Sequence, residues 1–134
     1  MVVHSASKYL GGHSDIIGGV VIGRKEDIDQ IAQSERELFG AVMSPFDSWL
    51  MLRGIRTLPV RMKQHMVNAM EMAAYFQELP VVKEVIYPWW ETHPQYELAK
   101  KQMTGASGLM SVVFDLPGEQ IAIHGQRAAG GAAE

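Results

Sequence analysis

The sequence predicts a mixed α/β fold, in which short strands alternate with amphipathic helices. Residues 16–23 form a β-branched, glycine-flanked run with the composition of a buried strand. From Leu58 to Phe76, apolar side chains recur at three- and four-residue spacing, which indicates one apolar helix face over about five turns. Two further strand-like runs, residues 81–87 and 109–116, are separated by a short helical segment. This order of elements is typical of α/β and α+β proteins.

Glycines divide the first 40 residues into short elements. Residues 2–3 begin the chain with an apolar run, and the polar segment after them ends at the glycine pair 11–12. After the first predicted strand, residues 25–39 carry spaced apolar side chains in a polar background, which predicts a helix or two short ones. Gly40 follows as the expected helix stop.

Two helices are predicted in the middle of the chain. Ser44 and Pro45 mark a helix start, because a hydroxyl at the N-cap and a proline in the first turn both favour that position. We expect this helix to end near Arg53, because Gly54 follows it. A longer second helix is expected from about Leu58.

The remaining elements follow Pro80. Residues 81–87 are predicted to form a strand closed by Pro88, and residues 94–103 a short helix. After a loop of small residues, residues 109–116 are predicted to form the last strand.

Composition excludes several classes of protein. The 134 residues are 47% hydrophobic and 20% charged, which suits one globular domain or parts of two. A formal net charge of -3 gives no basic footprint for nucleic acid, and no apolar run reaches the roughly 18–20 residues of a membrane span. The first residues lack the features of a secretory signal, so we expect a cytoplasmic protein. Zero cysteines exclude disulfides, thiolate nucleophiles and cysteine-based zinc sites.

Lys8 is the candidate for chemistry, since it lies between an apolar strand and a glycine-rich turn. A partly desolvated lysine at a strand end has a lowered pKa and acts as an amine nucleophile. The hydroxyls of Ser5 and Ser7 could hold an anion such as phosphate beside it. This combination suits pyridoxal phosphate, whose aldehyde reacts with a lysine amine. The spacing alone also fits a surface lysine with serines that mark a turn, so both interpretations stay open.

The segment around Lys8 resembles a known family. Residues 4–15 (HSASKYLGGHSD), with the glycine pair 18–19, are similar to the cofactor-lysine segment of the Cys/Met metabolism family of pyridoxal-phosphate enzymes. That family includes cystathionine gamma-synthase, cystathionine beta-lyase, cystathionine gamma-lyase, methionine gamma-lyase and the O-acetylhomoserine sulfhydrylases. Residues 44–62 and 93–103 resemble two further blocks in the same order, and the resemblance covers about residues 1–118.

The resemblance implies part of a fold type I pyridoxal-phosphate transferase. Residues 1–64 would be the end of the large cofactor domain, and residues 65–118 would begin the small α+β C-terminal domain through the long helix. Residues 119–134 are small and aperiodic, so we expect a disordered tail. In this interpretation the sequence is a fragment of a longer enzyme.

The resemblance also assigns roles to site residues. Lys8 would be the lysine that holds pyridoxal 5'-phosphate as a Schiff base and later the base at the substrate Cα. Ser5 and Ser7 would contact the cofactor phosphate. No metal is expected, because His65 and His93 lack the spacing of metal ligands.

Five other polar residues are expected to be structural. His13 and Asp15 fit the family pattern, yet polar groups in a glycine turn most often brace the loop by hydrogen bonding. Arg53, Arg56 and Arg61 are expected to neutralise carboxylates or cap carbonyl groups.

The implied activity is the making or cleaving of C–S bonds in small sulfur amino acids, as in cystathionine gamma-synthase or cystathionine beta-lyase. Methionine gamma-lyase or O-acetylhomoserine sulfhydrylase activity is the alternative within the family. The resemblance implies a homo-oligomer, a tetramer of dimers in the full-length family, with no nucleic-acid or membrane partner. The family's pyridine-binding aspartate, stacking aromatic ring and carboxylate-binding arginine cannot be placed on this sequence, so a catalytically inert fragment is a further alternative.

Overall fold

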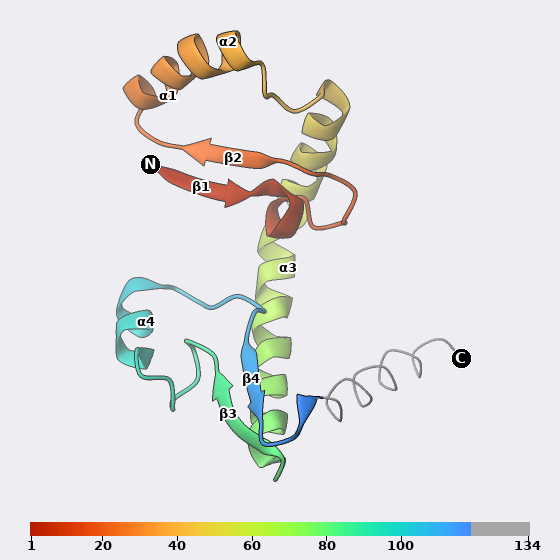
Figure 1. Ribbon diagram of the computed structural model, residues 1–134, viewed down its shortest axis with the longest axis vertical. Helices are drawn as coiled ribbons and strands as arrows, with labels where there is room; N and C mark the ends of the chain where they lie inside the picture. Colours follow the sequence, from red (N-terminus) through yellow and green to blue (C-terminus); the bar gives the residue numbers. More distant parts are fainter. Residues whose placement is uncertain (119–134) are drawn as a thin grey trace, which may run out of the picture. The chain divides into compact units, whose positions relative to one another are not determined.

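The computed structural model describes residues 1–118 of the chain and has the mixed helix and strand content that the sequence predicts. The expected tail, residues 119–134, lies outside the described residues. In chain order the elements are β1 (Val2–Ser5), the π-helical turn η1 (Ala6–Leu10), β2 (Gly19–Ile22), α1 (Lys25–Ile31), the π-helical turn η2 (Ala32–Arg36), α2 (Glu37–Phe39), α3 (Pro45–Glu78), β3 (Val82–Ile86), α4 (Tyr96–Gln102) and β4 (Ser111–Phe114) (Figure 1).

The chain divides into two compact units, Met1–Met62 and Lys63–Glu134, and the division falls within α3. Each unit has its own two-stranded antiparallel sheet, β1–β2 in the first and β3–β4 in the second. The assignment of residues 1–64 and 65–118 to two enzyme domains stays a prediction. Within residues 1–118, no helix is long and apolar enough to cross a membrane.

The sheet of the first unit holds the ends of the segment that contains Lys8. β1 and β2 pair in a regular register, in which Val2 lies opposite Ile22 and Ser5 lies opposite Gly19. β2 is shorter than the predicted strand at residues 16–23. Ser5 and Gly19 are the last pair of residues in this ladder. The chain between them therefore leaves and re-enters the sheet at the same end of the two strands.

The helical region after β2 agrees with the sequence prediction. α1, η2 and α2 follow one another without a break over residues 25–39 (Figure 1). Gly40 adopts a φ of 69°, the left-handed conformation that commonly ends a helix and that glycine adopts without a side-chain penalty.

The start of α3 has the predicted cap. The backbone N–H of Asp47 donates to Ser44 Oγ at 3.0 Å, which satisfies one of the amide donors that a helix N-terminus leaves unpaired. The Ser44 hydroxyl in turn donates to Asp47 Oδ2 at 2.9 Å. Pro45 is the first helical residue, where its missing N–H costs no hydrogen bond.

The prediction of two helices separated at Gly54 is wrong, because α3 continues through both Gly54 and Pro59. Pro59 lacks the N–H that would otherwise bond the carbonyl one turn earlier, which weakens the helix locally. The carbonyl without this partner is that of Ile55. At the neighbouring carbonyl, Thr57 Oγ1 donates to Gly54 O at 3.0 Å, and Arg61 Nη2 donates to the same oxygen at 2.9 Å. These bonds, which the sequence pattern did not reveal, reinforce the helix beside the proline.

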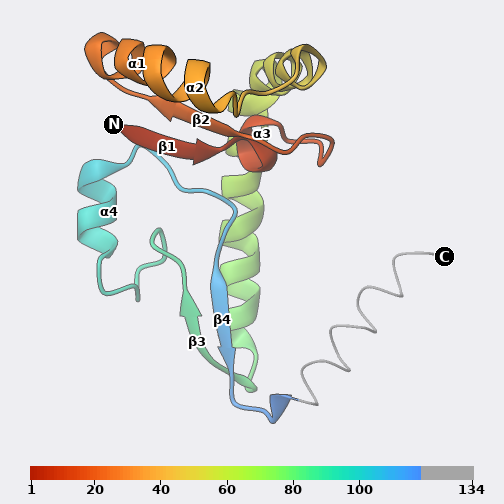
Figure 2. The ribbon, with the colours of Figure 1, turned by 45° about the horizontal axis from the view of Figure 1, so that its top comes forward.

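Gly54 is required by a close approach between α3 and the end of η1 (Figure 2). A Cβ placed on this buried glycine would lie 2.1 Å from the carbonyl oxygen of Gly11 and 2.7 Å from that of Leu10. The small buried core beside this contact consists of Ala6, Ile16 and Leu50. The glycine therefore marks the place where the turn seats on the helix.

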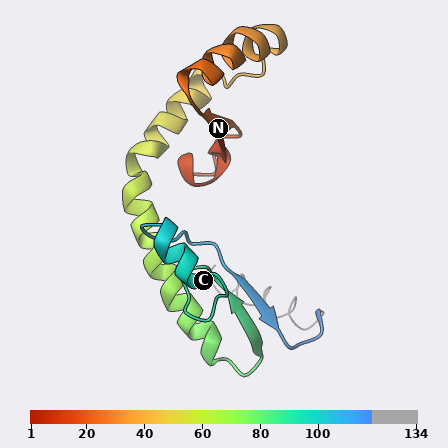
Figure 3. The same ribbon diagram turned by 90° about the vertical axis from the view of Figure 1, so that its left-hand side faces the viewer.

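The second unit is organised around the C-terminal part of α3, along which β3 and β4 run (Figure 3). Its buried core joins Ala69 and Ala73 of α3 to Val85 and Tyr87. The buried Tyr87 hydroxyl donates to the Ser107 carbonyl at 2.8 Å, which satisfies its polar end. The elements after Pro80 agree with the predicted strand–helix–strand order, with shorter strands than the apolar runs suggest.

We expect Ser44→Ala to lower the free energy of unfolding by about 1 kcal/mol, because Asp47 loses its capping partner. Urea unfolding followed by circular dichroism measures this change. Ser48→Ala is the matched control, since it lies one turn into the same helix and should leave stability unchanged or slightly higher. Equal effects of the two substitutions would contradict the cap.

Gly54→Ala separates helix propensity from close packing. In an exposed helix the change would add about 1 kcal/mol of stability, whereas the 2.1 Å approach to Gly11 predicts a loss of about 2 kcal/mol. Gly19→Ala is the control, because its Cβ would meet only His4 O at 3.7 Å. A Gly54→Ala chain that unfolds at higher urea concentration than the wild type would show that the contact does not exist.

Candidate functional site

Lys8 lies in the middle of η1, directly after the strand that precedes it. Its backbone departs from helical geometry, with φ -100° and ψ -120°, so the turn is kinked at this residue. The side chain is exposed. The expectation that Lys8 is partly desolvated is therefore wrong for this chain, because the residue is exposed among the described residues 1–118.

Ser7 connects the lysine turn to the start of β2. Its Oγ accepts a hydrogen bond from the Gly18 N–H at 3.0 Å and donates to the Gly18 carbonyl at the longer distance of 3.4 Å. The same carbonyl accepts from the Ala6 N–H at 2.8 Å. The half-buried hydroxyl thus has a fixed position with a weakly held proton, beside the residue that carries the amine.

Ser5 is the last residue of β1 and is exposed. The structure therefore brings all three predicted site residues, Ser5, Ser7 and Lys8, to one strand end and the turn that follows it. Their roles toward a cofactor remain predictions. Chemically, the cluster offers one primary amine and two hydroxyl donors at the surface of the first unit.

His13 and Asp15 brace the glycine loop, as the sequence interpretation expects. His13 Nδ1 donates to the Gly11 carbonyl at 2.9 Å. Asp15 Oδ2 accepts from Arg53 Nη2 at 2.6 Å, an ion pair between residues 38 apart in the sequence. The expectation that Arg53 neutralises a carboxylate is confirmed.

Arg61 caps the carbonyl of Gly54, which confirms one expectation, but it also has a contact that sequence reasoning missed. A Cβ on Gly12 would lie 2.3 Å from Arg61 Cζ, so the guanidinium lies directly against Gly12. Gly12 has a φ of +76°, which disfavours any side chain there. The signal available in the sequence was the four-residue spacing of Arg53, Thr57 and Arg61, which places them on one helix face.

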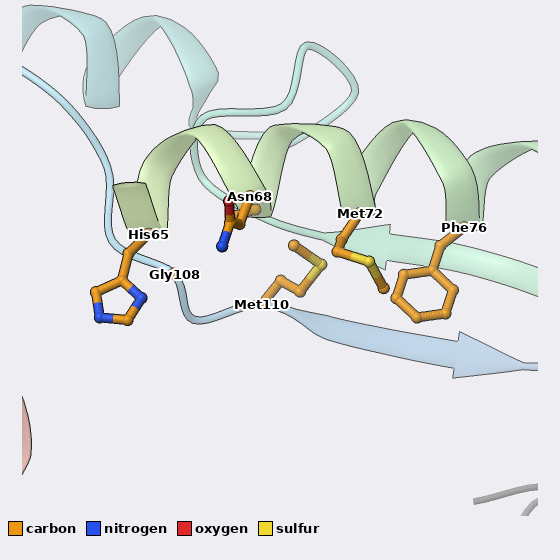
Figure 4. A pocket seen from close by; sticks show the side chains of 7 residues that line it. His65, Asn68, Met72, Phe76, Gly108 and Met110 are labelled. Atoms are coloured by element: carbon orange, nitrogen blue, oxygen red, sulfur yellow. The ribbon is translucent and has the colours of Figure 1, made fainter. Parts of the chain in front are cut away.

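The second unit contains an open, mainly apolar pocket of about 220 Å³ (Figure 4). Figure 4 shows His65, Asn68, Met72 and Phe76 on α3, with Met110 on the segment that leads into β4. None of the predicted site residues lines it. Residues 1–118 contain no group of three His, Cys, Asp or Glu side chains placed to hold a metal ion.

Comparison with known proteins supports the resemblance of the lysine segment. The family described as "Cys/Met metabolism PLP-dependent enzyme" matches residues 1–126. Cystathionine beta-lyase of Coxiella burnetii is 47% identical over 113 residues, which cover 84% of this chain and 29% of that protein. L-methionine gamma-lyase of Porphyromonas gingivalis is 45% identical over 119 residues, which cover 88% of this chain and 29% of the relative.

Solved structures similar to this chain come from enzymes of the same kind as its sequence relatives. Cystathionine gamma synthase from Xanthomonas oryzae, solved in complex with aminoacrylate and cysteine, aligns with a TM-score of 0.84 and 35% identity. The alignment covers 90% of this chain and 31% of that one, so the present chain spans about a third or less of the length of these relatives. With a match over residues 1–126 and the shared fold, the chain belongs to the Cys/Met metabolism PLP-dependent enzyme family.

Proposed function

We propose that this chain carries the cofactor lysine of a pyridoxal-phosphate-dependent enzyme that makes or cleaves C–S bonds in sulfur amino acids. The observation that carries the proposal is the placement of Lys8. Lys8 is exposed and directly follows Ser7, whose hydroxyl is held by Gly18, and both residues lie within the range that matches the family.

The donors present fit pyridoxal 5'-phosphate. The Gly18 N–H occupies a lone pair of Ser7 Oγ, while the proton of this hydroxyl makes only the long 3.4 Å contact to the Gly18 carbonyl. Turning that proton to a phosphate oxygen would exchange a weak hydrogen bond for a charge-assisted one. Ser5, exposed at the end of β1, supplies a second hydroxyl donor. Lys8 supplies the amine that reacts with the cofactor aldehyde.

Each residue has a distinct task in the proposed reaction. Pyridoxal phosphate, when bound, withdraws electrons from the substrate Cα. Lys8 would supply the amine that holds the cofactor and, when free, the base that moves a proton to or from that carbon. Ser5 and Ser7 hold the phosphate, which keeps the cofactor in register with Lys8.

For the reaction itself we favour the cystathionine gamma-synthase or cystathionine beta-lyase type, acting on a small sulfur amino acid. Methionine gamma-lyase or O-acetylhomoserine sulfhydrylase activity is the alternative, and the similar identities of 47% to a beta-lyase and 45% to a methionine gamma-lyase give neither a clear preference. A cytoplasmic homo-oligomer is part of the same proposal.

The exposure of Lys8 favours one second candidate, a chain that is inert by itself. A lysine amine in water lacks the dry surroundings that enzymes use to favour nucleophilic attack. In that case the chain would bind cofactor weakly and turn over no sulfur amino acid.

We expect pyridoxal phosphate to attach to Lys8 in preference to other lysines of the chain. Incubation with the cofactor, reduction with borohydride and peptide mass spectrometry should place the largest labelled fraction on Lys8. Lys25→Ala, which removes another exposed lysine of the same unit, should leave this labelling unchanged, whereas Lys8→Ala should abolish it.

Even labelling of Lys8 and the other exposed lysines would overturn the assignment of Lys8 as the cofactor lysine. Turnover of cystathionine, a homoserine ester or methionine by the loaded chain would contradict the inert alternative and distinguish the reaction types.

Ser7→Ala should weaken binding of pyridoxal phosphate about tenfold, because one charge-assisted hydrogen bond to the phosphate is lost. Binding of pyridoxal, which has no phosphate, should change little in the same variant. Comparing the two ligands separates phosphate recognition from a general loosening at Gly18, which would weaken both equally. Ser34→Ala, which removes a hydroxyl on η2, is the control and should affect neither.

A further inference from the structure

One face of α3 holds the glycine loop that follows Lys8 at two separate points. Arg53, Thr57 and Arg61 are spaced at four-residue intervals and so share a helix face. At the far side of the loop, Arg53 pairs with Asp15 at 2.6 Å. At the near side, the Arg61 guanidinium lies against Gly12.

The position of Arg61 is itself fixed. Its Nε donates to Thr57 Oγ1 at 3.0 Å and its Nη2 donates to the Gly54 carbonyl at 2.9 Å. Nε and Nη2 both belong to the planar guanidinium group, and the side chain is half-buried. Such a planar fork binds two acceptors and still presents a flat surface to a glycine, which a lysine ammonium does not.

The contact at Gly12 is connected to Lys8 through the backbone. The Gly12 N–H donates to the Lys8 carbonyl at 2.8 Å, and the Gly11 N–H donates to the Ala6 carbonyl at 2.8 Å. Lys8 is the kinked residue of this turn, so the direction in which its side chain leaves depends on the bonds that hold its peptide. Holding Gly12 therefore holds the carbonyl of Lys8.

We propose that Arg61 is a positioning residue for Lys8, which fixes the kinked turn through Gly12, and that the Arg53–Asp15 pair anchors the other end of the same loop. This inference rests on the proposed function for its chemical consequence, and on geometry alone for its structural one. Arg61 itself does not touch the reacting amine. It sets the direction from which the amine approaches a ligand.

The structural arm of the test measures hydrogen exchange of backbone amides in the full 134-residue chain. Arg61→Ala should speed exchange of the Gly11 and Gly12 amides about tenfold, while amides of the second unit keep their rates. Arg56→Ala, an exposed arginine of the same helix, is the matched control and should change none of them. Unchanged exchange at Gly12 in Arg61→Ala would overturn the proposal.

Gly12→Ala tests the same contact without removing the arginine. A methyl group there would displace the guanidinium, since the Cβ would lie 2.3 Å from Arg61 Cζ. Because a side chain at a φ of +76° also strains the turn, Gly12→Ala should speed exchange of the same amides at least as much as Arg61→Ala does, and adding Arg61→Ala to it should change little further. Fully additive effects would show that Gly12 and Arg61 act independently, against the proposal.

The chemical arm follows the rate at which Lys8 is trapped with pyridoxal phosphate and borohydride. Arg61→Ala should slow trapping about tenfold, and added guanidinium at concentrations far below those that unfold proteins should restore part of the rate, whereas ammonium should not.

Faster exchange with an unchanged trapping rate would overturn the positioning role and leave the proposed function intact. If the wild-type chain shows no preference for Lys8, the proposed function fails, and the exchange data alone decide whether Arg61 holds the turn.

Discussion

The first unit depends on the close approach of α3 to the end of η1 at Gly54. No atom beyond Cα fits between the helix and the carbonyl of Gly11, so the two backbones touch directly. Backbone contact of this kind sets a position more narrowly than side-chain packing does, since neither partner has rotamers to adjust. The lysine turn consequently has a defined position against the helix, although the adjoining core of Ala6, Ile16 and Leu50 is small.

Polar contacts surround this backbone contact at Gly54. Pro59 weakens the helix about one turn later by leaving the Ile55 carbonyl without its amide partner, and Thr57 and Arg61 add donors at the adjacent Gly54 carbonyl. The same arginine then meets Gly12, whose lack of a side chain leaves room for it. One short stretch of α3 thereby supports its own backbone and the loop that follows Lys8. A substitution in either the helix or the loop should therefore alter the stability of the other.

Local signals in the sequence predicted most elements but not how they meet. The cap at Ser44, the stop at Gly40 and the strand–helix–strand order after Pro80 depend on neighbouring residues, and all three are confirmed. Gly54 suggests a helix end because glycine commonly has that role, but this prediction is wrong: here the glycine serves a contact with a segment more than 40 residues away. Only tertiary structure distinguishes the two uses of the same residue.

The exposure of Lys8 separates two requirements of a reactive amine that usually occur together. Direction is supplied within this chain, by the kinked turn, the Ser7–Gly18 bonds and the contacts of α3. Desolvation is not, since the residues described leave the side chain in water. A cofactor ring bound over the turn, or parts of the longer relatives that this chain does not span, would have to supply it. A preorganised but solvated lysine should therefore attach cofactor selectively while gaining little catalytic power, because selection needs geometry and catalysis also needs a dry site.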